Sequence, residues 1–320
     1  MTEPIRTEIA VIGAGVIGLA IAERLVAEGR EVTLVDPGEP GMGASYGNAG
    51  TIADYAVMPV GSPDVLKNLP SLLFDRSSPL SIRRAAIPSL MPWLARFAWQ
   101  SRPGPTARNA AAIARLLAGH VGAKARIVTA RAERIERRVD GVMVTGAGLS
   151  LHARKVVLAA GAHSRALAAQ AGDRVPLDTE RGYHVEWDMQ TPRLTRPSCP
   201  TSRGFYLCPM QGRLRVAGTV ELGGLAAPPS AHRIAKLVEG ARAIFPDLPE
   251  PSREWMGFRP SVPDSVPVIG PSAKGGDILH AYGHGHIGLT LAPITARIVA
   301  SLIMGRDAEL DLAPYLPSRF

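Results

Sequence analysis

The segment from Ile9 to Asp36 constrains the fold of this chain more than any other stretch. A short apolar run ends at Gly13, an apolar helical period extends from Val16 to Val26, and a second apolar run ends at Asp36. This order of strand, helix and strand is typical of the first βαβ unit of a dinucleotide-binding sheet. The chain is therefore expected to begin with such a sheet.

Three glycines at the strand-to-helix turn have the GxGxxG spacing. Gly13 suits the tight turn, Gly15 lets the backbone approach a pyrophosphate, and Gly18 lets the helix pack closely. Asp36 ends the second strand, where a carboxylate accepts hydrogen bonds from ribose hydroxyl groups. A lone GxGxxG is weak evidence, but here the strands, the helix and the acid agree. The sequence predicts a bound adenine dinucleotide, with FAD and NAD both open at this point.

Composition favours a globular protein that can hold two structural units. The 320 residues carry a net charge of +8, but the basic residues are scattered, which argues against a nucleic acid site. The start of the chain shows no signal-peptide order, and its two cysteines fit neither a metal site nor a disulfide framework, so we expect a cytoplasmic protein. A weak attraction of this basic protein to the inner face of an anionic membrane stays open.

The stretch after Asp36 is rich in glycine, where a nicotinamide enzyme normally continues into a helix. Residues 43–50 suit contact with a long ligand, and a surface loop is the alternative. Residues 61–105 and 106–117 have helical patterns. The aromatic and basic side chains between 83 and 102 indicate either a helix packed on its own domain or a membrane-surface face.

The second half of the chain is dominated by strand patterns. Residues 125–135, 141–144 and 155–161 are predicted to be strands, and from Asp178 short alternating runs predict an antiparallel sheet. A helix is expected near residues 231–244. Residues 278–303 are predicted to form a strand, a glycine-rich turn and a helix. The apolar stretch from Ile287 to Met304 is nearly long enough to span a bilayer, but it contains Pro293 and Arg297, so a buried helix of the domain is predicted instead.

Six features in order, GAGVIG, Asp36, GASYGNAG, VVLAAG, MGFRPSVPDSVPVIG and GHGHIGLTLAP, resemble the FAD-dependent D-amino-acid dehydrogenases. These belong to the wider group of D-amino-acid oxidase, glycine oxidase and sarcosine oxidase, and the resemblance covers nearly the whole chain. It implies an α/β fold with a doubly wound FAD-binding domain of the glutathione-reductase type and an α+β substrate domain on a mixed or antiparallel sheet. Residues 1–60, 121–178 and 263–320 are expected in the first domain, 61–120 in a helical insertion and 179–262 in the second.

The resemblance implies FAD as the cofactor and a set of positions around it. The three glycines of the first turn would hold the pyrophosphate and Asp36 the adenosine ribose. The small residues between 44 and 50 would line the pyrophosphate and the flavin, the backbone of Ala132 would approach the adenine, and Gly161 would pack near the cofactor. Residues 286–290 would face the pyrimidine edge of the flavin. The positions are Gly13, Gly15, Gly18, Asp36, Ala44, Ser45, Asn48, Ala49, Gly50, Ala132, Gly161, His286, Ile287, Gly288, Leu289 and Thr290. A helix that begins at the last group would direct N–H groups at charge that appears on flavin reduction.

Four residues are candidates for the substrate site. Arg259 matches the family position whose guanidinium holds the substrate carboxylate, and a salt bridge is its alternative role. Tyr183, His184 and His284 are expected either to contact substrate or to form hydrogen bonds within the core. The other histidines have no ligand spacing, so no metal site is predicted.

The implied activity is oxidative deamination of a D-amino acid or a cyclic imino acid. Hydride would pass from Cα to flavin N5, water would hydrolyse the imine to a 2-oxo acid and ammonia, and a quinone or another carrier would take the electrons. The chain is shorter than members of this group, and the missing part is expected between Leu117 and Lys124. A flavin-binding protein without turnover is therefore the alternative.

Overall fold

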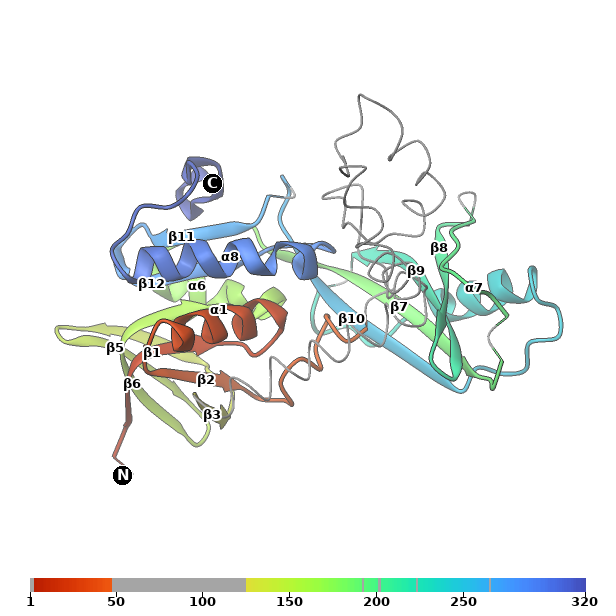
Figure 1. The fold of residues 1–320 in the computed structure, drawn as a ribbon, viewed down its shortest axis with the longest axis horizontal. Coiled ribbons are helices and arrows are strands. Elements are labelled where there is room, and N and C mark those ends of the chain that lie inside the picture. The colour runs from red at the N-terminus through yellow and green to blue at the C-terminus, as the bar shows by residue number, and fades with distance from the viewer. Residues whose placement is uncertain (1–2, 48–124, 192, 201–202, 223, 265) are drawn as a thin grey trace, which may run out of the picture.

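The computed structural model describes residues 3–47, 125–191, 193–200, 203–222, 224–264 and 266–320. Within these ranges the chain forms two β-sheets, each with helices packed against it (Figure 1). The predicted α/β class is confirmed. The helices predicted between residues 61 and 117, and the expected shortening between Leu117 and Lys124, lie outside the described residues.

The first sheet contains the predicted βαβ unit. Its main path has the order β11-β12-β6-β1-β2-β3, and the hairpin of β4 and β5 is attached to β6. All neighbours from β12 to β3 are parallel, whereas β11 and the hairpin strands are antiparallel to their partners. The strands are β1 (Ile5–Ile12), β2 (Val32–Asp36), β3 (Arg126–Thr129), β4 (Arg134–Arg138), β5 (Gly141–Gly146), β6 (Leu149–Leu158), β11 (Val268–Ser272) and β12 (Gly275–Tyr282).

Helices cover both faces of this sheet. Helices α1 (Val16–Ala27) and α8 (Gly288–Ile303) pack side by side on one face, where Leu25 and Val299 belong to one buried cluster (Figure 1). Helix α6 (Ser164–Ala171) packs on the other face, next to the hairpin. Three short 3₁₀ turns complete this part, η2 (Gly161–His163), η3 (Ala313–Tyr315) and η4 (Pro317–Arg319).

The second sheet is antiparallel, in the order β10-β7-β9-β8. Its elements are β7 (Asp178–Asp188), β8 (Phe205–Met210), β9 (Arg213–Leu222), α7 (Ala231–Arg242) and β10 (Arg253–Ser261). Helix α7 covers one face, where Tyr183, Val185 and Trp187 join the core. Because side chains alternate along a strand, the intervening residues of β7 face the opposite side of the sheet.

One predicted strand is two strands in the structure. The sequence predicts one continuous strand over residues 125–135, but β3 ends at Thr129 and β4 begins at Arg134. The chain changes partner between them, because the Ala130 N–H donates to Asp36 O of β2 whereas the Glu133 N–H donates to Thr145 O of β5. The sequence pattern of residues 125–135 does not reveal that the chain changes its partner strand within the segment.

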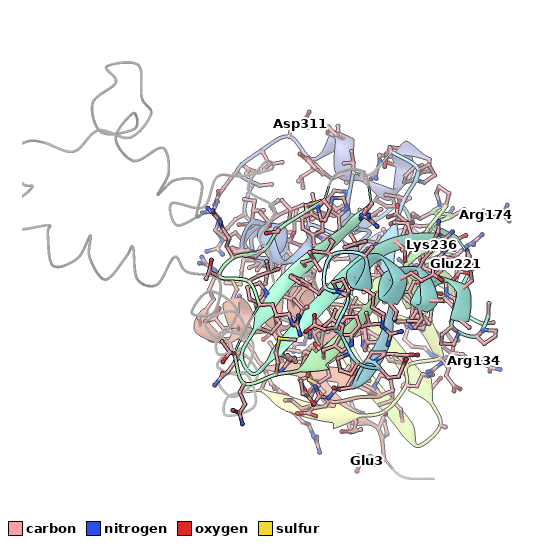
Figure 2. All side chains as sticks on the ribbon, turned by 90° about the vertical axis from the view of Figure 1, so that its right-hand side faces the viewer. Glu3, Arg134, Arg174, Glu221, Lys236 and Asp311 are labelled. Atoms are coloured by element: carbon pink, nitrogen blue, oxygen red, sulfur yellow. The ribbon has the colours of Figure 1, made fainter. Side chains whose placement is uncertain are left out.

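Several charged side chains lie at the periphery, as Figure 2 shows for Arg134, Arg174 and Lys236. Helix α8 is the predicted buried helix, with Pro293 in its first half. None of the helices in the described part combines the length and the hydropathy that a membrane-crossing segment requires.

A buried hydrogen-bonded pair ties the segment just after α6 to β12 of the first sheet. The carboxylate of Asp173 lies 2.8 Å from Nε2 of His280 and accepts the N–H of Ala273 at 3.0 Å. Burial alone would raise the pKa of Asp173, but the hydrogen bonds of His280, Ser272 and Ala273 outweigh it and lower the pKa to about 2. The charged carboxylate is therefore part of the folded state down to low pH.

Replacing Asp173 by asparagine is expected to lower the free energy of unfolding by about 3 kcal/mol at pH 7, because it removes one partner of a buried pair. The folded pKa is about 2 and the unfolded value about 3.9, so the contribution of Asp173 is present above about pH 4 and is lost as the pH falls through the folded pKa. Urea unfolding at several pH values measures both effects. Asp140→Asn, in an exposed pair with His152, is the control, and equal losses in the two variants would contradict the assignment.

Candidate functional site

One large cavity lies between the two sheets. Its volume is about 1970 Å³, and it is lined by the glycine-rich turn of the first sheet and by β7, β9 and β10 of the second. Pockets for single small ligands usually occupy about 300–1,000 Å³. The cavity is therefore large enough for a dinucleotide together with a small substrate.

The turn between β1 and α1 has the geometry that its glycines predict. Gly13 has φ of +108°, and a Cβ there would lie 2.4 Å from the carbonyl oxygen of Ala159. At Gly18 a Cβ would lie 1.8 Å from the carbonyl oxygen of Gly13, so the helix can pack only without a side chain. Gly15 differs, because a Cβ there would meet nothing within 4 Å and would project into the cavity. This open cradle at the N-terminus of α1 fits a pyrophosphate.

The carboxylate of Asp36 supports the same turn. Its Oδ2 accepts the N–H of Ala14 at 2.7 Å, and its Oδ1 accepts the N–H of Gly38 at 2.8 Å. Each carboxylate oxygen can accept more than one hydrogen bond, so capacity remains for ribose hydroxyl groups at the cavity wall. Asp36 therefore shapes the turn as well as lining the site.

Most of the other predicted cofactor positions also border the cavity. Ala44, Ser45, Ala132 and Gly161 line it. Gly161 has φ of +55° and open space where a side chain would lie. The predicted positions Asn48, Ala49 and Gly50 lie outside the described residues.

The N-terminus of α8 closes another part of the cavity. His286, Gly288 and Leu289 line it, whereas Ile287 caps the helix and Thr290 lies in its first turn without lining the cavity. The first turn of this 16-residue helix contains no acidic residue. Its free N–H groups and positive dipole end can therefore interact with a ligand that carries or develops negative charge.

His284 borders the cavity but is deeply buried. Its Nε2 lies 3.0 Å from Oγ1 of Thr295, and its Nδ1 has no partner among the described residues. Burial lowers the pKa of His284 to about 4, so the imidazole is neutral at pH 7. A neutral ring offers one donor and one acceptor rather than a charge.

Arg259 lies on β10 and lines the cavity. Its guanidinium extends over Gly182, where a Cβ would lie 2.4 Å from Nη2. Burial lowers the pKa of Arg259, and the charge of Glu180 opposes that effect, but an arginine stays protonated at any ordinary pH. Within the described part of the chain the guanidinium has no hydrogen bond or ion pair. The donors of this half-buried cation are therefore available to a ligand that enters the cavity.

The two neighbouring candidates on β7 occupy opposite faces of the sheet. The hydroxyl of Tyr183 contacts the carboxylate of Glu221 and accepts the N–H of Ser230 at 3.2 Å on the α7 side. Of the two roles expected for Tyr183, the structure places its hydroxyl in the core hydrogen bonds and not beside Arg259, although the residue borders the cavity. His184 faces the other way and stacks on Trp255, with ring centroids 4.9 Å apart, and it does not line the cavity.

The sequence reasoning missed three residues of the site. Glu180 lies directly opposite Arg259 in the register of β7 and β10 and also lines the cavity. Gly182 makes room for the guanidinium, and Trp255 covers Gly47 at the end of the loop after β2. Part of this arrangement could have been predicted from the alternation of side chains along β7. Alternation places Glu180, Gly182 and His184 on one face of the sheet and Tyr183 on the other.

Comparison with known proteins gives consistent matches over the whole chain. The sequence matches the DAO family, described as FAD dependent oxidoreductase, over residues 8–102 and 78–302. It is 32% identical to a D-amino-acid oxidase of Bradyrhizobium diazoefficiens, over 98% of each chain. It is 27% identical to D-amino acid dehydrogenase 2 of Ralstonia nicotianae, over 98% of this chain and 100% of the relative. The first alignment has 416 positions and this chain 320 residues, so the relative contains residues without a counterpart here.

Solved structures show the same fold. A glycine oxidase from Geobacillus kaustophilus superposes with a TM-score of 0.75 at 22% identity, over 99% of each chain. An L-proline dehydrogenase from P. horikoshii superposes with a TM-score of 0.71 at 19% identity, over 99% of this chain and 98% of that one.

Proposed function

Because the chain belongs to the DAO family of FAD-dependent oxidoreductases, whose members act on amino acids, we propose that it oxidises a D-amino acid or a cyclic imino acid at the Cα–N bond. A D-amino acid would give an imine and, after hydrolysis, a 2-oxo acid and ammonia, whereas a cyclic imino acid would give a cyclic imine whose hydrolysis opens the ring and releases no ammonia. The preference for the D-enantiomer is supported by relatives that are named D-amino-acid oxidase and D-amino acid dehydrogenase.

The observation that carries this proposal is the unpaired guanidinium of Arg259. A cation that is half-buried in a cavity and has no partner within the described residues is ready to bind an anion from solution. The planar guanidinium matches a carboxylate with two parallel hydrogen bonds. An α-carboxylate bound there is fixed in orientation as well as in position.

Glu180 provides a complementary charge. It faces Arg259 across the strand pair and lines the same cavity. Neither side chain has a hydrogen bond or an ion pair within the described residues. We assign the carboxylate of Glu180 to the amino group of the substrate, so that the carboxylate and the amino group of the substrate contact the two side chains.

The remaining residues hold and polarise the site. FAD, when bound, supplies the acceptor for the hydride from Cα. The chain would hold it through the turn of Gly13 to Gly18, Asp36, and the backbone at the start of α8. Positioning by Arg259 contributes most of the catalysis that the protein itself provides. His284 is neutral at pH 7, so it adds no charge that competes with the substrate.

The direct test is a turnover assay with D- and L-amino acids and both prolines, in which 2-oxo acid or imine and ammonia are measured. Oxygen and a quinone analogue are supplied in separate reactions to identify the electron acceptor. We expect product with D-amino acids or cyclic imino acids, and a rate that rises with pH because the neutral amine is the reacting form. A rate that stays flat through the alkaline range would contradict that mechanism.

The alternative, a protein that binds FAD without turnover, has one specific observation in its favour. The alignment with the first relative has nearly a third more positions than this chain has residues. If residues without a counterpart form a wall of the substrate cavity, the flavin would bind and no amino acid would react.

A further inference from the structure

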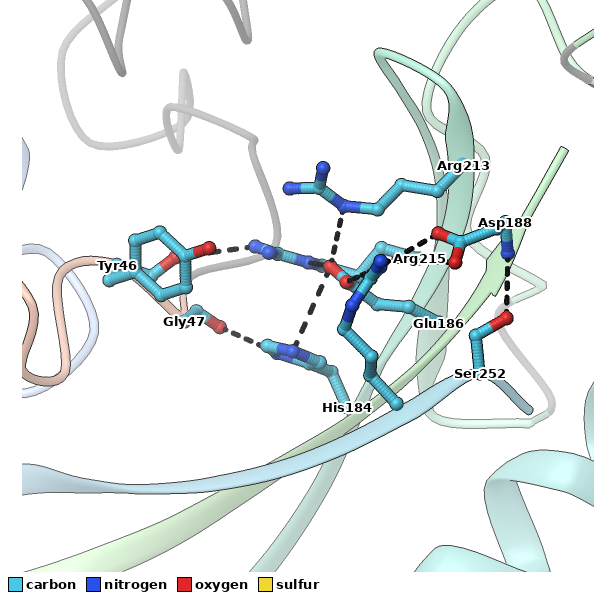
Figure 3. A network of polar contacts seen from close by, with 9 residues as sticks. Tyr46, Gly47, His184, Glu186, Asp188, Arg213, Arg215 and Ser252 are labelled. Carbon is cyan, nitrogen blue, oxygen red and sulfur yellow. Dashed lines mark hydrogen bonds and ion pairs between the residues drawn. The ribbon is translucent and has the colours of Figure 1, made fainter. Parts of the chain in front are cut away.

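A buried charged cluster lies on the face of the second sheet that is opposite α7. Glu186 is at its centre and accepts from Nε of Arg215 at 2.7 Å and from Nε of Arg213 at 3.0 Å (Figure 3). Glu186 and Arg215 are 4% and 2% exposed. Burial alone would raise the pKa of Glu186, but the two guanidinium groups outweigh it and lower the pKa, so the carboxylate is charged.

The cluster reaches across to the loop that follows β2. Nη1 of Arg215 donates to the carbonyl oxygen of Tyr46 at 3.3 Å, and Nδ1 of His184 lies 3.2 Å from the carbonyl oxygen of Gly47 (Figure 3). Burial and, second, the charge of Arg215 lower the pKa of His184, so its ring is neutral at pH 7. A carbonyl oxygen only accepts, so Nδ1 carries the proton and donates to Gly47.

Trp255 completes the attachment of the loop. Its ring stacks on His184 with an interplanar angle of 12°. A Cβ on Gly47 would lie 2.0 Å from Cη2 of Trp255, so the ring packs directly against the loop backbone. Arg215, His184 and Trp255 of the second sheet therefore hold two successive residues of the loop that follows β2. These two residues are Tyr46 and Gly47.

The same loop forms a wall of the cofactor cavity. Met42, Gly43, Ala44, Ser45 and Gly47 line the cavity. Among the described residues, the backbone hydrogen bonds of this loop beyond regular elements are those that the N–H groups of Gly41, Met42 and Tyr46 donate to the carbonyl oxygens of Ala14, Glu39 and Gly43. After Gly41, the described hydrogen bonds that join the loop to the rest of the protein thus come from the second sheet.

Buried ion pairs seldom add net stability over apolar residues of similar volume, but they can specify one arrangement. We propose that the cluster of Glu186, Arg215 and His184 is a positioning device, which holds the loop of residues 42–47 against the substrate sheet and thereby sets the affinity for FAD. The proposal rests on FAD binding and not on the identity of the substrate. Sequence alone does not reveal it, because the register between β7 and β9 brings its charges together.

The test uses two replacements of His184 that separate its ring from its donor. His184→Phe keeps a ring to stack on Trp255 and removes the hydrogen bond to Gly47. His184→Asn loses the ring and keeps a side-chain N–H near the position of Nδ1. Titration of the apoprotein with FAD, followed by quenching of flavin fluorescence, gives the dissociation constant. We expect it to rise about tenfold in His184→Phe, as for the loss of one buried hydrogen bond, and to change less than about threefold in His184→Asn.

His232→Ala, an exposed histidine on α7, is the control and should bind FAD as the parent does. The thermal midpoints of the apoproteins distinguish positioning from general stability. An unchanged dissociation constant in His184→Phe, or an equal weakening in both variants, would overturn the proposal. Failure of both apoproteins to fold would also overturn it, because His184 would then serve the fold rather than the cofactor.

Discussion

Arg259→Ala is expected to raise the substrate concentration for half-maximal rate by about a hundredfold or more, because the variant leaves the substrate carboxylate in the cavity without a partner. The affinity for FAD should stay within about threefold, since Arg259 has no described contact with the nucleotide-binding turn. Steady-state kinetics and FAD titration on the same preparation measure the two quantities.

Matched variants show which property of Arg259 matters. Arg259→Lys keeps the charge but loses the planar fork, so an intermediate loss of about tenfold is expected. Glu180→Gln removes the charge assigned to the amino group and should weaken substrate binding with little change in FAD affinity. Arg174→Ala, at the periphery in Figure 2, should behave as the parent. Unchanged kinetics in Arg259→Ala would remove Arg259 from the substrate site.

Gly15→Val is expected to weaken FAD binding by at least about a hundredfold, because its side chain would occupy the cradle where the pyrophosphate is expected. The fold should tolerate the change. Gly15 has φ of −71°, which any residue can adopt, and no atom lies within 4 Å of a Cβ there. Loss of glycine at this helix cap should cost about 1 kcal/mol at most.

The matched control is Gly276→Val in β12. A Cβ at Gly276 also meets nothing within 4 Å, but this exposed glycine does not line the cavity. Its FAD dissociation constant should equal that of the parent. Parent-like FAD affinity in folded Gly15→Val would contradict the pyrophosphate position, and the circular dichroism of the apoproteins verifies folding.

The parts of the site that sequence predicts are those set by local geometry. The turn around Gly13 and Gly18 follows from glycine spacing between a strand and a helix, because Gly18 is constrained by the backbone of Gly13 in the same turn and Gly13 needs a positive φ. The antiparallel sheet after Asp178 is likewise predicted from the alternation of apolar and polar residues within single strands.

The parts that sequence does not predict depend on register between distant strands. Glu180 faces Arg259 only because β7 and β10 pair in one particular register, which packing of the whole sheet determines. The contact of His184 with Gly47 joins two sheets and has no local signal. The sequence patterns give Tyr183 and His184 the same two possible roles, although alternation along one strand separates their side chains.

The central claim is that this chain uses bound FAD to oxidise an amino acid, and anaerobic reduction tests it most directly. The purified holoprotein is expected to show the visible absorbance bands of a flavin. Addition of a D-amino acid or a cyclic imino acid without oxygen should bleach those bands in the parent, and Arg259→Ala should need far more substrate. A yellow protein that no amino acid or imino acid bleaches would contradict the proposed activity, and a colourless protein that binds no added FAD would contradict the assignment of its cofactor site.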